Sequence, residues 1–121
     1  NKLNQNKIRT SLFINPNLKD VKLAKKIGSR CIEIHTGKIS NKIKNKQSYV
    51  KDLENIKKCA KLGKLLDLEV HAGHGIDYKT AKILSRIKEI EEFNIGHFII
   101  GESIFDGFKH TIKKFKRIIK S

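Results

Sequence analysis

The sequence of 121 residues contains no methionine, and we therefore expect it to be part of a longer chain. It has only two cysteines, one in a strand-like run (Cys31) and one in a helix-like run (Cys59), which argues against a disulfide framework and favours a reducing cytosol. No apolar run approaches the roughly 20 residues that a membrane span needs. The polar start (residues 1–5) has no signal-peptide character, so we expect a cytoplasmic protein without a membrane partner.

Arginine is scarce although the chain is strongly basic. The net charge is +15 with 27 basic residues, yet arginine occurs only at Arg9, Arg30, Arg86 and Arg117. Nucleic-acid recognition favours the planar guanidinium and stacking aromatic side chains, and aromatic residues make up only 7% of the chain. We therefore expect a solvated lysine surface that attracts anionic substrates, and nucleic acid is not an expected partner. A basic RNA-binding module is the weakest alternative.

Strand-like and helix-like runs alternate four times, with a period of about 30 residues. Such alternation predicts an α/β fold with a parallel sheet and crossover helices. Four units make either a small open sheet or half of a TIM (β/α)₈ barrel, and the absent start favours the half barrel, with residues 1–121 forming its C-terminal half. The predicted strands are 9–14, 31–35, 68–72 and 92–96, the predicted helices are 18–27, 47–66, 77–87 and 107–119, and residues 36–46 are predicted as a polar loop.

Local signals mark some of the boundaries. Gly28 suits the position after a helix, and Asp77 suits an N-cap. Residues 97–100 could extend the fourth strand or begin a short helix, because periodicity does not separate the two in so short an apolar run.

Strand alternation sorts side chains between the two faces of the sheet. In the second strand, Ile32 and Ile34 suit packing against helices, which directs Glu33 to the opposite face near the carboxyl end of the strand. Catalytic groups of barrels lie at that end, so we predict a functional role for Glu33. Glu69 and His71 would share this face nearer the amino end of the third strand, where we expect structural roles.

Gly73-His74-Gly75 lies where the third strand ends and the next helix begins. Ligands of α/β folds bind at this edge, and the flanking glycines allow a sharp turn and a close approach of a ligand to the backbone. If the third and fourth strands are the seventh and eighth of a barrel, Gly75, Gly96 and His97 are the expected phosphate contacts. Histidines recur at strand ends, but their spacing does not match a metal site, and we predict none.

Several motifs occur together in the order and spacing of a known family. The sequence resembles the pyridoxine 5′-phosphate synthase family of vitamin B6 biosynthesis, over its C-terminal half only. The motifs are Ser-Leu-Phe-Ile (11–14), Ile-Glu-Ile-His-Thr-Gly (32–37), Ala-Gly-His-Gly (72–75), Asn-Ile-Gly-His (94–97) and Ile-Ile-Gly (99–101).

The resemblance implies a (β/α)₈ barrel that condenses 3-amino-2-oxopropyl phosphate with 1-deoxy-D-xylulose 5-phosphate, giving pyridoxine 5′-phosphate, phosphate and water. It implies that His74 is a general acid, that Glu33 stabilises charge in intermediates, and that Gly75, Gly96 and His97 contact substrate and phosphate. The family's remaining catalytic groups belong to the N-terminal half of the barrel, which is an expected partner, and the family forms multimers, so we expect a homo-oligomer. No cofactor is expected. Another phosphate-binding barrel enzyme, an isomerase or aldolase, is the main alternative.

Overall fold

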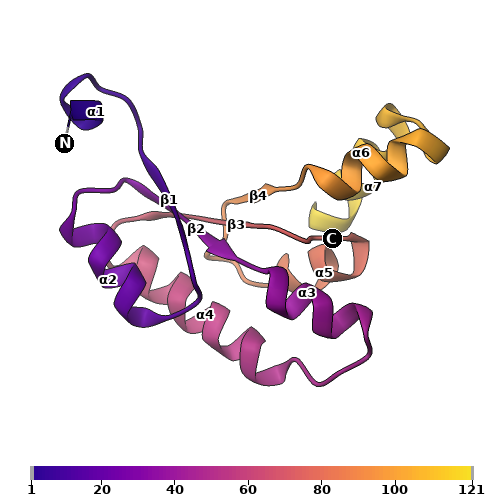
Figure 1. Cartoon of the computed structure of the whole chain (residues 1–121), viewed down its shortest axis with the longest axis horizontal. Helices are drawn as coiled ribbons and strands as arrows, with labels where there is room; N and C mark the ends of the chain where they lie inside the picture. Colours follow the sequence, from indigo (N-terminus) through magenta and orange to yellow (C-terminus); the bar gives the residue numbers. More distant parts are fainter. Residues whose placement is uncertain (1, 121) are drawn as a thin grey trace.

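The computed structural model of the chain describes residues 2–120 and has an α/β fold built on one parallel sheet (Figure 1). Four strands lie in the order of the sequence: β1 (Ser11–Ile14), β2 (Cys31–His35), β3 (Glu69–Gly73) and β4 (Glu92–Asn94). The helices are α1 (Lys2–Gln5), α2 (Leu18–Lys26), α3 (Gly37–Lys44), α4 (Val50–Leu65), α5 (Tyr78–Leu84), α6 (His97–Asp106) and α7 (Phe108–Lys120). The predicted strand–helix alternation is confirmed.

One face of the sheet forms the core. Ile32 and Ile34 of β2 and Val70 and Ala72 of β3 are each 0% exposed, and α2 and α4 pack against the sheet on this side (Figure 1). Leu12 of β1 packs against the same cluster. The predicted sorting of β2 and β3 side chains is therefore confirmed.

Helix ends follow the local signals in the sequence. Asp77 caps α5, because its Oδ1 accepts a hydrogen bond of 2.7 Å from the Thr80 amide, and Asn17 caps α2 in the same way through the Asp20 amide. Gly28 follows α2 with φ at +83°, a left-handed conformation that glycine adopts without steric cost.

The polar loop predicted for residues 36–46 is wrong, because α3 occupies most of it. Ile39, which is 1% exposed, and Ile43 lie one helical turn apart and pack against the core. The hydroxyl of buried Ser40 donates to the carbonyl oxygen of Thr36 at 2.8 Å. Two apolar side chains at this spacing are enough to fix a short helix once a core surface is available.

Several further boundaries differ from the prediction: β1 begins at Ser11 and not at residue 9, and α5 ends at Leu84 and not at residue 87. Helix α4 begins at Val50, three residues later than predicted. Strand β4 ends at Asn94, because its pairing with β3 covers only three residues, and the ambiguous residues 97–100 belong to α6. Among residues 2–120, no helix combines the length and apolar character that crossing a membrane requires. Both cysteines are free and buried.

Candidate active site at the carboxyl edge of the sheet

The backbone at His74 has an uncommon conformation that hydrogen bonds from Thr36 stabilise. His74 follows β3 with φ at +78°, a left-handed conformation that residues other than glycine seldom adopt. The hydroxyl oxygen of Thr36, which is fully buried, lies 2.7 Å from the carbonyl oxygens of both Gly73 and His74, and the Thr36 amide donates to Gly73 at 2.9 Å. Thr36 therefore holds the turn that presents the His74 side chain.

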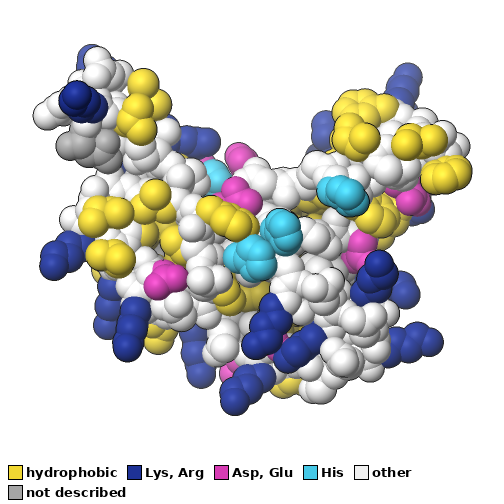
Figure 2. Space-filling model, viewed as in Figure 1, with side chains coloured by type: hydrophobic (Ala, Val, Ile, Leu, Met, Phe, Trp, Pro, Cys, Tyr) yellow, Lys and Arg dark blue, Asp and Glu magenta, His cyan; other side chains and the backbone are white. Residues whose placement is uncertain are grey.

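The His74 ring stacks on the ring of His35 from β2. The ring centroids lie 4.7 Å apart with an interplanar angle of 25°, and the Phe13 ring meets His35 edge-on at 5.1 Å. A Cβ at Gly37 would lie 2.8 Å from both imidazoles, so only glycine fits there. Burial, and then the proximity of His74, lowers the pKa of His35, which favours a neutral His35. Histidine side chains gather near the centre of the face seen in Figure 2.

Glu33 is held on the same face by β4. Its Oε2 accepts a hydrogen bond of 2.6 Å from Nδ2 of Asn94, a residue 61 positions away in the sequence. A Cβ at Gly73 would lie 2.0 Å from Glu33 Oε1, so the glycine makes room for the carboxylate. The half-buried Glu33 carboxylate is therefore fixed at one oxygen by Asn94, through a charge-assisted hydrogen bond.

The two glycine–histidine loops line one pocket of about 630 Å³. The loop after β3 contributes His74 and Gly75, and the loop after β4 contributes Gly96 and His97, so the four positions predicted from the sequence come together. Gly96 is the N-cap of α6, whose first backbone amides suit an anion. The lining also includes Asn94, which contacts Glu33, and three residues of α3: Ser40, Asn41 and Lys44.

Several contributors to this site are not apparent from the sequence. Thr36 and Asn94 act through hydrogen bonds to residues far away in the sequence, and their pairing depends on strand register. Lys44 reaches the pocket only because residues 37–44 form a helix. In the sequence, nothing distinguishes Lys44 from the other lysines of this segment.

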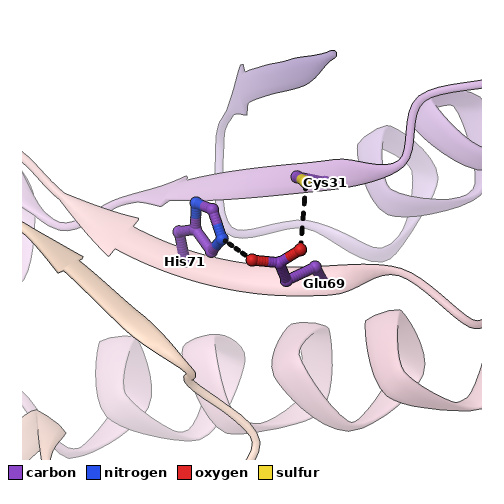
Figure 3. Close-up of side chains that lie close together, drawn as sticks. All are labelled: Cys31, Glu69 and His71. Carbon is purple, nitrogen blue, oxygen red and sulfur yellow. Dashed lines mark hydrogen bonds and ion pairs between the residues drawn. The ribbon is translucent and has the colours of Figure 1, made fainter. Parts of the chain in front are cut away.

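A second cluster lies on the same face of the sheet, at the amino ends of β2 and β3 (Figure 3). Cys31 Sγ lies 3.6 Å from Oε2 of Glu69, and His71 Nε2 lies 2.9 Å from Oε1 of the same carboxylate. Nη1 of Arg9 contacts both carboxylate oxygens, at 2.8 and 2.9 Å. The hydrogen bond with His71 is the main cause of the lowered pKa of Glu69, and burial raises the pKa of the Cys31 thiol. Glu69 and His71 thus lie inward, as predicted.

Comparison with known proteins identifies the family. The model of the family described as pyridoxal phosphate biosynthesis protein PdxJ matches residues 1–121. The chain is 64% identical over 115 residues to the pyridoxine 5′-phosphate synthase of Pelagibacter ubique, covering 95% of this chain and 48% of the relative. The synthase of a Sulfurihydrogenibium species is 44% identical, with 97% of this chain and 47% of the relative covered, and that of Zymomonas mobilis is 41% identical, with 93% and 43% covered. The chain spans about half the length of these relatives and belongs to the PdxJ family.

Proposed function

We propose that the intact protein containing this chain is a pyridoxine 5′-phosphate synthase. It condenses 3-amino-2-oxopropyl phosphate with 1-deoxy-D-xylulose 5-phosphate and releases pyridoxine 5′-phosphate, inorganic phosphate and water. Membership of the PdxJ family and the names of its relatives support this reaction. The observation that carries it is the single pocket shared by the loops after β3 and β4, which contains both glycine–histidine pairs.

The proposal includes a complete (β/α)₈ barrel, of which residues 1–121 form the C-terminal half. The sheet runs in sequence order without a reversal, and β1 and β4 are its edge strands. The face that carries Glu33, His35 and Glu69 is the one that would line the barrel interior. A further segment, supplying the other strands, would pair with both edges and remove the unpaired backbone groups there.

In the proposed mechanism, His74 is the general acid that helps to expel a leaving group. Its ring is exposed to the pocket, and the stack with His35 and the turn held by Thr36 fix its direction. Glu33, fixed by Asn94, stabilises positive charge that develops in intermediates. Imidazole can exchange protons near neutral pH, which suits the role given to His74.

Phosphate binding is assigned to Gly75, Gly96 and His97. The amino end of α6 offers unpaired backbone amides and a favourable field for an anion, worth about 0.3–1 kcal/mol. Lys44 adds a positive charge to the pocket lining. We further propose a cytoplasmic homo-oligomer that needs no cofactor.

The test uses the intact protein with both substrates, and it measures pyridoxine 5′-phosphate and inorganic phosphate together. Equal amounts of both products, formed only when both substrates are present, are expected. Release of phosphate from one substrate alone would instead indicate another phosphate-handling barrel enzyme.

A further inference from the structure

Three side chains capable of binding a metal converge at the amino ends of β2 and β3 (Figure 3). Cys31 pairs with Glu69 in the parallel register, and His71 lies two residues beyond Glu69 on the same face of β3. One donor atom from each residue lies within 4.8 Å of the others. Cys31 is 0% exposed and the His71 side chain is 3% exposed, so two of the three donors are buried and held in place by the packing of the sheet.

The donor set has the chemistry that zinc prefers. A thiolate, an imidazole nitrogen and a carboxylate oxygen are its usual protein ligands. With metal–ligand bonds of about 2.0–2.3 Å, the donors of a tetrahedral site lie about 3.3–3.6 Å apart. Cys31 Sγ lies 3.6 Å from Glu69 Oε2, and His71 Nε2 lies 2.9 Å from the other oxygen, Oε1. With all three donors within 4.8 Å of one another, side-chain shifts of about 1 Å would bring them to this spacing.

The second nitrogen of His71 faces a carboxylate of a third strand. Nδ1 lies 3.7 Å from Oε1 of Glu92, the first residue of β4, while Nε2 points toward Glu69. A metal-bound histidine commonly directs its other N–H at a carboxylate, which fixes the ring and its tautomer. This observation is independent of the three donors, because it concerns a residue of another strand.

In contrast to the prediction of no metal site from the histidine spacing, we propose that Cys31, Glu69 and His71 form a Zn²⁺ site, with the fourth position open to water. The site lies at the end of the strands opposite to the candidate active site, because Cys31 and Glu69 are the first residues of β2 and β3. Zinc there would join β2 to β3 without taking part in the reaction proposed for the carboxyl edge. Binding forms a Zn–S bond and releases the thiol proton to solvent, so the affinity increases with pH.

Arg9 is the competitor of the metal. Its guanidinium contacts both oxygens of Glu69 and is itself half-exposed, so it can leave the carboxylate when a dication takes its place. An ion-pair network that never binds metal would need Arg9 for its stability, whereas a zinc site would bind metal more tightly without Arg9. The two interpretations therefore predict opposite effects of removing this side chain.

The experiment titrates Co²⁺, as a spectroscopic probe for zinc, into intact protein that has been treated with a chelator. We expect one equivalent to give a thiolate-to-cobalt charge-transfer absorption that Zn²⁺ abolishes by displacement. Cys31→Ser should remove this absorption, whereas the matched control Cys59→Ser should retain it, because Cys59 lies in α4 and burial raises its pKa to about 11. Glu92→Gln should weaken binding about 10-fold or more.

The variant Arg9→Gln tests the opposite effect, an increase in metal affinity. The Arg9–Glu69 ion pair is half-exposed and screened by solvent, so removing the competitor should tighten Co²⁺ binding by about 2- to 5-fold. Circular dichroism checks that each variant is folded. The proposal is overturned if neither the parent nor Arg9→Gln shows the thiolate absorption, or if folded Cys31→Ser keeps it.

Discussion

Asn94 and Glu33 are joined by a hydrogen bond of 2.6 Å between Nδ2 and Oε2, across β3, which lies between their strands. The hydrogen bond can cross β3 because the β3 residue between Glu33 and Asn94 is Gly73, which has no side chain. Gly73 pairs with Asn94 in the register, and any side chain there would collide with Glu33. The relationship makes Asn94 a positioning residue for the proposed chemistry of Glu33.

We expect Asn94→Ala to lower kcat about 10- to 100-fold, because a hydrogen bond to a charged group contributes about 1.5–3 kcal/mol. Asn94→Asp should lower kcat further, since a second carboxylate would repel Glu33. Steady-state kinetics of the intact enzyme measure both effects. The matched control is Asn55→Ala, an exposed asparagine of α4. An unchanged kcat in Asn94→Ala, with the thermal midpoint also unchanged, would contradict the positioning role.

Gly96→Val tests the phosphate site. Gly96 has φ at −110°, and a Cβ there would meet no other described atom within 4 Å, so valine fits without collision and projects into open space. We expect KM for a phosphorylated substrate to rise and competition by inorganic phosphate to weaken, with a loss of stability no larger than the roughly 1 kcal/mol of an N-cap change.

The control for Gly96→Val is Gly101→Val, at another glycine of α6 with open space around its Cβ and no place in the pocket lining. Inhibition by phosphate is measured at equal ionic strength for the parent and both variants. If all three are inhibited alike, the phosphate binds elsewhere.

Asp52 of α4 forms ion pairs with two lysines of α3, so we expect the free energy of unfolding to fall at acidic pH. Its carboxylate pairs with Lys42 and, at 3.4 Å, with Lys38, and the hydrogen bond from Lys42 is the main cause of its lowered pKa. Because the folded-state pKa lies below the unfolded value of about 3.9, the stabilisation is complete above about pH 4. It is lost as the pH falls through the folded-state pKa.

We expect Asp52→Asn to lower the free energy of unfolding by about 1–2 kcal/mol near pH 6, a difference that shrinks below about pH 4. Denaturant unfolding at several pH values measures it. The control is Asp106→Asn, at an exposed residue of α6. A difference that stays constant down to pH 3 would show that the lost ion pairs are not its cause.

The chain of residues 1–121 should be inactive by itself. Among residues 2–120, no further strand pairs with the outer edges of β1 and β4, and no strand covers the face that carries Glu33. We expect association in solution and no turnover, measured by light scattering and by product formation. Turnover by the isolated chain at the rate of the intact enzyme would contradict the half-barrel proposal.

Local sequence patterns are sufficient to predict the strands and helices that bury one continuous apolar face. Residues 31–35 form β2 as predicted, and alternation correctly divided Ile32 and Ile34 from Glu33. The sequence gives little sign of helix α3, because only Ile39 and Ile43 mark its buried side, among lysines and asparagines that are typical of loops. The links from Asn94 to Glu33 and from Cys31 to Glu69 depend on strand register, which alternation within a single strand does not determine.

The ring stack of His35 and His74 illustrates the same limit. Both residues were placed at strand ends by the sequence, but their contact depends on the left-handed turn at His74 and on the space at Gly37. The turn is stabilised by hydrogen bonds from Thr36, which lies at the end of the neighbouring strand β2. The position of the loop is therefore predictable from the sequence, whereas its geometry is not.

The most direct measurement compares kcat of the intact enzyme with that of His74→Asn, together with the dissociation constant for 3-amino-2-oxopropyl phosphate. His110→Asn, at an exposed histidine of α7, is the matched control. If His74 is the general acid, kcat falls about 10²- to 10⁴-fold while the dissociation constant changes little, because proton transfer is lost and the phosphate contacts remain. A kcat equal to that of the parent and of His110→Asn would contradict the proposed mechanism.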